Sequence, residues 1–265
     1  MPYRIESNKE DLSSDSIRKY LSRDDKGIVI FSAEMTVSTN NDAKEYLLHG
    51  AGETALFVSD AQSGGRGRLG HTFHSPKGCG IYMTIALPER CELEKMLSLT
   101  PAAAVSVCRA IERLTDKKPM IKWVNDIFLG TKKLCGILCE AVTDTHGNTM
   151  GAVVGIGMNF RSVPFPDDIA GIVCALDEPK ITRSEMIAAI TDEFLNIVPY
   201  ASSDTVMDEY RDRCMVLGRD ITYVRNGIPV KAKALSIGKG GELIVKNETG
   251  ETEELSGGGI RILFD

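Results

Sequence analysis

The sequence predicts an α+β fold, in which a mixed-sheet domain with helices is followed by a small β-barrel. Two observations carry this prediction. Strand and helix patterns are mixed without a regular βαβ alternation over the first 217 residues, and two adjacent strands are expected to form a hairpin. Beyond residue 218 only short strand patterns remain, separated by glycine-containing turns. We therefore expect a large domain over residues 1–217, with a short lead-in at 1–27, and a small domain over residues 218–265.

The first part of the large domain contains apolar runs that predict strands and polar clusters that predict helix starts. Ile17, Tyr20 and Leu21 stand at helical spacing in the lead-in. A cluster of helix-capping residues at 38–42 predicts the start of a helix that continues through 43–51. The strands expected here are residues 28–31, 54–59 and 80–87.

The second part of the large domain is expected to hold three helices and three strands. Thr100 followed by Pro101 predicts a helix start. From Val105 to Leu114 an apolar residue recurs at every third position and marks one buried face. Residues 120–129 and 133–142 are expected to form the hairpin, and a third strand covers 150–160. The further helices are expected at 184–199 and 204–217, the latter closed by Gly218.

The small domain is expected to contain four short strands, at residues 221–225, 230–236, 242–246 and 261–264. Asn226-Gly227 and the glycines around residue 240 mark the turns. A domain of about 50 residues has too little core to be independent of its neighbour.

Charge and composition exclude several classes of protein. The chain has 265 residues with 31 Lys plus Arg and 37 Asp plus Glu, a net charge of −6, so it lacks the broad positive field that non-specific nucleic-acid binding needs. The polar N-terminus does not resemble a signal peptide, and no apolar stretch approaches the ~18 residues of a membrane span. The seven cysteines form no CxxC or paired framework. We therefore expect a cytoplasmic protein without a membrane segment.

The glycine loop at residues 64–70 is the clearest functional signal. Gly65, Gly67 and Gly70 match G-x-G-x-x-G, but the chain continues into a strand and not into the helix that a dinucleotide site requires. A protein-kinase loop is also excluded, because the other kinase motifs are missing. Arg66 and Arg68 then predict a loop that binds an anion, since guanidinium groups suit carboxylate and phosphate oxygens.

Three further segments are each more typical of structure than of function when taken alone. Lys122 lies in an apolar strand, where burial would require an anionic partner. The segment 132–138 pairs two lysines with an apolar strand. The alternating Gly155 and Gly157 suggest a flat ligand against the backbone, with Asn159 available for recognition of a base.

Taken together and in order, these motifs resemble those of the biotin protein ligases, over roughly residues 28–265. The motifs are Ser38-Thr39-Asn40, then Gln62 with Gly65-Arg66-Gly67-Arg68 and Gly70, Ser75-Pro76 with Gly78, Lys122-Trp123 with Asn125-Asp126, Lys133-Leu134 with Gly136-Ile137-Leu138, and Gly155-Ile156-Gly157 with Asn159. The resemblance implies a seven-stranded mixed sheet followed by an SH3-like barrel. It also implies ATP-dependent activation of biotin to biotinyl-5′-AMP with release of pyrophosphate. The biotinyl group then passes to one lysine of a biotin carboxyl carrier protein or carboxylase domain.

The resemblance assigns roles by motif position. Lys122 would lie between biotin's carboxylate and the α-phosphate and, with Arg66 and Arg68, carry the chemistry. Biotin would be bound by Ser38, Thr39, Asn40, Gln62, Gly65, Arg66, Gly67, Arg68, Lys122, Gly136, Gly155 and Gly157, and the nucleotide by Arg68, Phe73, Lys122, Asn125 and Asn159. Mg²⁺ is expected with ATP, held mostly by phosphates and water without a metal cage from the protein.

The chain departs from the family pattern at three positions. Phe73 replaces the usual Trp, His71 replaces Arg, and Val124 replaces Pro. These changes concern how firmly the adenylate is retained, because the loop is expected to close over it and exclude water.

Several alternatives stay open or are set aside. A lipoate or other acyl-carrier ligase would use the same adenylation chemistry, and a non-enzymatic nucleic-acid-binding module would use the basic loop and the barrel. His71, His74 and Cys79 match no zinc spacing, and Cys135 and Cys139 read as buried thiols. About 27 residues precede the first strand, too few for the helix-turn-helix of some relatives, so we expect no DNA binding. The sequence does not decide between a monomer and a homodimer.

Overall fold

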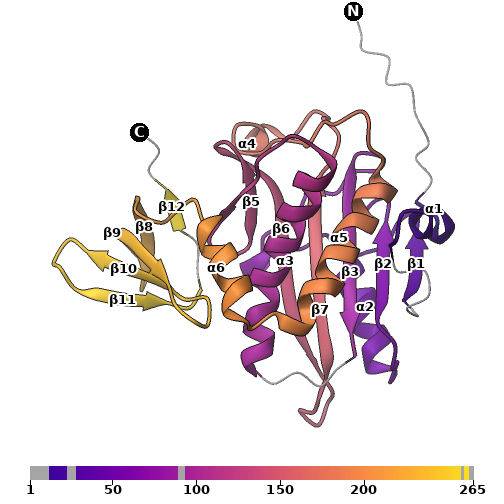
Figure 1. Ribbon diagram of the computed structural model, residues 1–265, viewed down its shortest axis with the longest axis horizontal. Helices are drawn as coiled ribbons and strands as arrows, with labels where there is room; N and C mark the ends of the chain where they lie inside the picture. The colour runs from indigo at the N-terminus through magenta and orange to yellow at the C-terminus, as the bar shows by residue number, and fades with distance from the viewer. Residues whose placement is uncertain (1–11, 23–27, 89–92, 258–259, 263–265) are drawn as a thin grey trace, which may run out of the picture.

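The computed structural model of the chain describes residues 12–22, 28–88, 93–257 and 260–262 (Figure 1). A large sheet with helices on both faces forms the main body, and a smaller sheet lies beside it, next to α6. The end of the lead-in holds α1 (Ser14–Arg18), which begins at a Ser13 side chain that caps the Ser16 N–H. Ile17 and Leu21 are buried against the core, whereas Tyr20 is exposed.

The large sheet has seven strands in the order β1-β2-β3-β7-β6-β5-β4. Only β1 and β2 are parallel, and every other neighbouring pair is antiparallel, so the expected mixed sheet is confirmed. The strands are β1 (Val29–Ala33), β2 (Ala55–Ser59), β3 (Gly80–Leu87), β4 (Met120–Lys122), β5 (Asp126–Leu129), β6 (Lys132–Thr143) and β7 (Thr149–Asn159).

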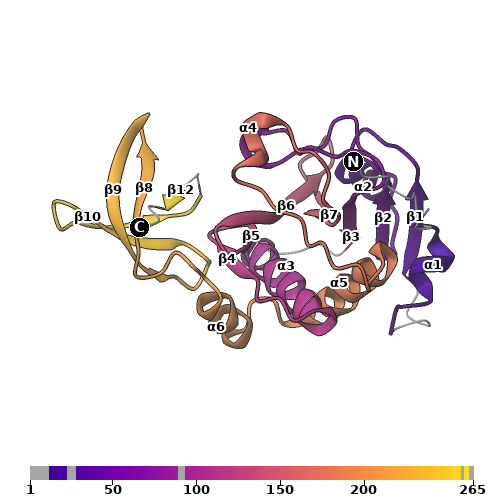
Figure 2. The same ribbon diagram turned by 90° about the horizontal axis from the view of Figure 1, so that it is seen from above.

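Helices cover the two faces of this sheet unequally (Figure 2). On one face, α3 (Leu93–Leu114) and α5 (Arg183–Ile197) pack together over the main core. On the other face, α2 (Thr39–Leu48) packs over β2, β3 and β7 around a small separate cluster. Because side chains alternate along a strand, Ile81 and Met83 of β3 reach opposite faces from Tyr82 and Thr84. The part of the second face that α2 leaves uncovered contains the cavity described below.

The C-terminal strands form a separate five-stranded antiparallel sheet in the order β11-β10-β9-β8-β12, a small barrel-like unit. Its strands are β8 (Asp220–Arg225), β9 (Ile228–Ile237), β10 (Leu243–Asn247), β11 (Thr252–Leu255) and β12 (Ile260–Ile262). The remaining helices are α4 (Asp167–Ala170), α6 (Asp204–Asp212) and two 3₁₀ turns at Arg68–Gly70 and Val198–Tyr200. No helix among the described residues is long and apolar enough to cross a membrane.

The predicted helix start at Thr100 is wrong, because α3 begins at Leu93 and contains Pro101 in its interior. Proline removes one helical hydrogen bond, but the residue whose carbonyl loses its partner, Leu97, is half exposed. Leu99 is buried in the core, so packing of the turns before the proline outweighs the local signal.

The predicted strand 120–129 is in fact a second hairpin. The chain reverses at Trp123–Asn125, and β4 pairs with β5 so that Lys122 lies opposite Asp126. The peptide bond between Trp123 and Val124 is cis. An apolar run reads as one strand whether or not it turns back on itself, so periodicity did not reveal this hairpin.

Two further predictions in the C-terminal part are corrected. Helix α6 ends at Asp212 and not at residue 217, because the backbone of Cys214 pairs with that of Ile121 in β4 as an isolated parallel β-bridge. Gly218 has the positive φ of 77° expected of it, but its N–H binds Ala234 O in the small sheet. The strand β11 was missed, since its sequence Thr-Glu-Glu-Leu is that of a charged sheet edge.

Candidate functional site

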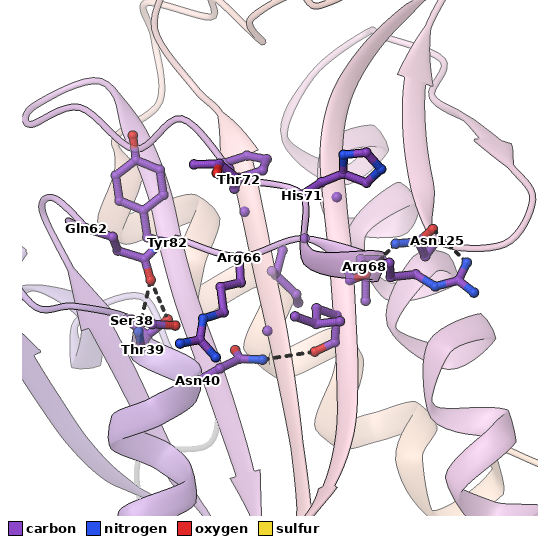
Figure 3. A pocket seen from close by; sticks show the side chains of 18 of the residues that line it. Ser38, Thr39, Asn40, Gln62, Arg66, Arg68, His71, Thr72, Tyr82 and Asn125 are labelled. Atoms are coloured by element: carbon purple, nitrogen blue, oxygen red, sulfur yellow. Dashed lines mark hydrogen bonds between the residues drawn. The ribbon is translucent and has the colours of Figure 1, made fainter. Parts of the chain in front are cut away.

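A cavity of about 280 Å³ opens on the face of the large sheet that α2 leaves uncovered (Figure 3). Its wall combines the N-terminus of α2, the glycine loop, and strands β3, β5, β6 and β7. The residues that line it are Ser38, Thr39, Asn40, Gln62, Arg66, Gly67, Arg68, Leu69, His71, Thr72, Phe73, Tyr82, Met83, Asn125, Asp126, Lys133, Gly136, Ile137, Leu138, Gly155, Ile156 and Gly157. The volume suits a small ligand.

One end of the cavity is a network of neutral hydrogen-bonding groups. The backbone N–H of Thr39 donates to Gln62 Oε1 at 2.9 Å, and Gln62 Nε2 donates to Ser75 Oγ at 3.2 Å. Ser38 is the N-cap of α2, yet its hydroxyl makes no capping hydrogen bond and faces the cavity. Because these groups are polar but uncharged, they fit the neutral hydrogen-bonding part of a ligand. Arg66 extends toward the same side of the cavity, toward Asn40 (Figure 3).

The floor of the cavity is made by strand glycines over which side chains lie closely. A Cβ added at Gly157 would come 2.8 Å from the Phe73 ring, and a Cβ at Gly155 would collide with the Asn40 amide. Gly136 lies beside Lys133, at 3.2 Å from a built Cβ to Nζ. In this structure Phe73 and Asn40 therefore occupy the space that the expected flat ligand would share with these glycines.

The other end of the cavity is cationic. Arg68 donates to the neutral Asn125 Oδ1 at 3.4 Å, and within the described residues no carboxylate pairs with Arg66 or Arg68. Lys133 Nζ lies 2.7 Å from Asp126 Oδ1, and both residues line the cavity. Guanidinium groups that face a cavity without a carboxylate partner are suited to an anionic ligand.

Lys122 does not line the cavity. It lies on the same face of the β4–β5 hairpin as Asp126, with its Nζ 5.4 Å from the centre of the Phe128 ring. The pKa of Lys122 is lower than usual, mainly because the side chain is partly buried. Nearby Asp126 partly offsets this lowering, and Lys133 adds to it. The carboxylate of Asp126 thus lies between two lysines, of which Lys133 reaches the cavity.

The glycine loop is an ordered hairpin. Phe73 N–H donates to Gly65 O at 2.9 Å, and Gly67 N–H donates to His71 O at 2.7 Å. A Cβ at Gly65 would lie 2.7 Å from Phe73 O, so only glycine fits there. Gly65 therefore shapes the loop without lining the cavity.

Both ends of the segment that carries this loop are tied to α5. Arg183 is 3% exposed and its Nη1 lies 2.6 Å from Asp60 Oδ1. The same Asp60 oxygen accepts the Gly78 N–H at 3.0 Å, and Arg183 also donates to Gly80 O. A buried pair of this kind holds the loop's entry and exit together.

The structure brings most of the predicted site residues to one cavity, and the exceptions are specific. Gly65, Lys122 and Asn159 do not line it, and Asn159 Nδ2 donates to Cys174 O at 3.1 Å beyond the end of the floor. Sequence reasoning noticed the segment 132–138 but selected only Gly136 from it, so Lys133 was missed. The signal that could have found Lys133 is its own motif, in which Lys133 stands three residues before Gly136.

The described residues contain no group of three or more His, Cys, Asp or Glu arranged for a metal ion. His71 and His74 are exposed. Cys135 is buried and Cys139 is partly buried, and burial raises the pKa of both thiols, that of Cys139 to about 12. Such thiols are poor nucleophiles at neutral pH.

Residues 32–159 match the biotin/lipoate A/B protein ligase family. Among similar proteins is the bifunctional ligase/repressor BirA of Bacillus subtilis, 34% identical over 193 residues, which are 71% of this chain and 59% of that protein. The chain thus spans about three fifths of the length of this relative. A biotin–[acetyl-CoA-carboxylase] ligase of Paracoccus denitrificans is 28% identical over 66% of this chain and 72% of its own length.

Solved structures share the fold. The biotin protein ligase of Aquifex aeolicus in complex with biotin and ATP superposes with a TM-score of 0.73 at 23% identity, over 89% of this chain and 99% of that one. The biotin protein ligase of Leishmania major in complex with biotinyl-5-AMP gives a TM-score of 0.60 at 22% identity, over 86% of this chain and 99% of the other. Residues 32–159 of this chain therefore form a domain of the biotin/lipoate A/B protein ligase family, homologous to biotin protein ligases.

Proposed function

We propose that this protein is a biotin protein ligase that activates biotin with ATP and transfers the biotinyl group to a lysine of a carboxyl carrier protein. The observation that carries the proposal is that one cavity combines neutral hydrogen-bonding groups at the N-terminus of α2 with a cationic end at Arg68 and Lys133. Biotin has the matching division, with a ureido ring at one end and a carboxylate at the other. The names of the similar ligases support the same choice of substrate.

In this proposal the neutral end binds the ureido ring. Ser38, Thr39 and Gln62 provide its hydrogen-bonding groups, and Gly157 lets the ring approach the backbone once Phe73 moves aside, while Asn40 stays over Gly155. The valeryl chain then points the carboxylate toward the cationic end.

The chemical step is attack of a carboxylate oxygen on the α-phosphorus of ATP. A new O–P bond forms while the bond to pyrophosphate breaks, so the products are biotinyl-5′-AMP and pyrophosphate. Both reactants are anions, and the main barrier is therefore their repulsion together with the charge that develops on phosphate and leaving group. Arg68 and Lys133 supply positive charge where these anions meet, and Arg66 adds positive charge to the same cavity from the side of Asn40.

Two parts of the site predicted from sequence enter the proposal in modified form. Lys122 lies outside the cavity, opposite Asp126 in the β4–β5 hairpin, and adds positive charge next to that carboxylate. Mg²⁺ would arrive bound to the triphosphate, and Asp126, the one carboxylate among the described residues that line the cavity, could help to hold it. The roles of Asn125 and Asn159 toward the nucleotide stay predictions.

In the second step the ε-amine of the carrier lysine attacks the acyl carbon of the adenylate, forming an amide and releasing AMP. Leu69, in the glycine loop, is exposed and lines the cavity, so in this proposal the carrier lysine approaches past it. The proposal keeps the cytoplasmic location and the carboxyl carrier partner expected from the sequence.

The direct test is ATP–pyrophosphate exchange measured with biotin, with lipoate and with no acid, followed by labelling of a purified carrier domain. We expect exchange and labelling that depend on biotin. Exchange driven by lipoate but not by biotin would assign the second substrate class, and salt-sensitive RNA binding without any exchange would refute an enzymatic role.

A further inference from the structure

Glu140 does not line the cavity, yet it contacts a residue that does. Asn40 Nδ2 donates to Glu140 Oε2 at 2.8 Å and to Leu138 O at 3.3 Å. The other carboxylate oxygen of Glu140 lies 2.6 Å from Lys44 Nζ. Since a carboxylate only accepts hydrogen bonds, Glu140 fixes the amide orientation of Asn40, with Nδ2 toward β6 and Oδ1 toward β3.

This orientation determines where the hydrogen of Thr84 lies. Thr84 is fully buried, and its Oγ1 is 2.7 Å from Asn40 Oδ1 and 2.8 Å from Thr39 Oγ1. A hydroxyl has one hydrogen, and Asn40 Oδ1 only accepts, so Thr84 donates to Asn40. Otherwise a buried amide oxygen would lose its partner, which is costly. Thr84 Oγ1 is then the acceptor for the Thr39 hydroxyl.

The same reasoning fixes Thr39, which lines the cavity. Its hydroxyl hydrogen goes to Thr84 at 2.8 Å, whereas the longer contact to Gln62 Oε1, 3.2 Å, is not needed because that oxygen accepts the Thr39 backbone N–H. With its hydrogen directed into the protein, Thr39 Oγ1 offers a lone pair to the cavity. The polar end of the cavity thus presents an acceptor at this position.

We propose that Glu140, held by Lys44, is a positioning residue that makes Thr39 an acceptor for an N–H group of the ligand. The inference rests on the proposed function, under which that N–H belongs to the ureido ring of biotin. The chain of contacts runs Lys44–Glu140–Asn40–Thr84–Thr39, across α2, β6 and β3. Glu140 acts on specificity from outside the cavity, without contact to the substrate.

The first test is biotin affinity by isothermal titration calorimetry for Glu140→Ala and Glu140→Gln. Loss of one well-formed hydrogen bond at the ligand corresponds to about a tenfold rise in Kd, so we expect that rise for Glu140→Ala. Glu140→Gln keeps an acceptor for Asn40 and should restore most of the affinity. Glu45→Ala is the matched control, because Glu45 is an exposed carboxylate on the same helix as Lys44. The kinetic counterpart is a higher KM for biotin with unchanged kcat and unchanged KM for ATP.

The second test is a double-mutant cycle with Thr39→Val. If Glu140 acts through the Thr39 hydroxyl, Glu140→Ala should raise Kd less than about twofold in the Thr39→Val background. The inference is overturned if Glu140→Ala raises the Kd for biotin by the same factor with and without Thr39→Val, or if Glu140→Ala binds biotin with wild-type affinity. Should Glu140→Ala fail to fold by circular dichroism, the cycle is run with Lys44→Met, for which we expect a smaller but equally non-additive loss. Absence of biotin binding by the wild-type chain would instead refute the proposed function.

Discussion

Replacing Lys133 and Lys122 separately by methionine distinguishes the two lysines that flank Asp126. Methionine keeps the apolar stem of lysine and removes the charge. Lys133 lines the cavity and Lys122 does not, so the structure predicts that Lys133→Met is the more damaging change. If Lys122 has the catalytic role that the sequence motif suggests, Lys122→Met is instead the more damaging change.

The size of the effect follows from Coulomb's law. Two unit charges 4 Å apart at an effective dielectric constant of about 20 interact by about 4 kcal/mol, which is close to a thousandfold in rate when the interaction is made in the transition state. Removal of Lys133 also leaves Asp126 without its partner at 2.7 Å, so a carboxylate would then repel the bound anions. For Lys122→Met, with its ammonium over the Phe128 ring, we expect about a tenfold loss or less.

The assay is biotin-dependent ATP–pyrophosphate exchange under kcat/KM conditions, with circular dichroism to confirm that each variant is folded. The double variant Lys133→Met/Asp126→Asn serves as the control for the stranded carboxylate and should be less impaired than Lys133→Met alone. Should Lys122→Met lose activity a thousandfold while Lys133→Met stays within tenfold of wild type, the reasoning from the cavity lining is refuted.

Three further predictions concern the floor, the loop and the pH dependence of stability. Gly157→Ala should weaken biotin binding measured by calorimetry, because once Phe73 has moved aside the added methyl group would occupy the floor that the ring of biotin approaches; unchanged affinity would mean that the ring does not lie over Gly157. Arg68→Gly should release biotinyl-5′-AMP, detected as biotin label on bystander lysines, since the loop loses its contact with Asn125; wild-type leakage would exclude this retaining role. A hydrogen bond from Arg213 lowers the pKa of Glu112 below its ordinary 4.5, so the stability it contributes is complete above that pH and is lost as pH falls through the folded-state pKa. Urea unfolding on both sides of pH 4.5 should therefore show that the free energy of unfolding falls less steeply with acid in Glu112→Gln than in the wild type. The same pH dependence in both proteins would contradict this.

Much of the large sheet could be predicted because its strands are strongly apolar. The strand 80–87 was predicted with its observed bounds, since all eight side chains are buried and the run is continuous. The start of α3 could not be predicted in this way, because a proline is a local signal while the burial of Leu99 depends on α3 packing against distant elements. The β4–β5 turn was missed for a similar reason: a hairpin without Asn-Gly or Asp-Gly looks like a single strand.

The site was predictable to the extent that motifs mark chemistry. The neutral end of the cavity, with Ser38, Thr39 and Gln62, and the two loop arginines occur in motifs whose residue types already suggest hydrogen bonding and anion binding. Which lysine reaches the cavity was not predictable, because it depends on the hairpin register that places Asp126 opposite Lys122 and beside Lys133. The contribution of Glu140 depends on a contact between residues a hundred positions apart, and a single sequence contains no sign of it.

The small C-terminal sheet belongs to the same physical unit as the cavity, although the chain reaches it last. Trp123 is 3% exposed and its Nε1 donates to Gly241 O at 2.8 Å, which ties the β4–β5 turn to the loop before β10. On the same turn, Tyr210 OH donates to Val124 O at 2.9 Å, so α6 holds the neighbouring residue. The next residue is Asn125, which accepts the hydrogen bond from Arg68. Because the turn is held on both sides by groups outside the cavity, the C-terminal sheet stabilises the cationic wall through this turn. Gly257, after β11, also lies beside Arg68, at 3.1 Å from a built Cβ to Nη2. Weakening the contact at Trp123 would therefore loosen the position of Arg68 while leaving the neutral end of the cavity unchanged.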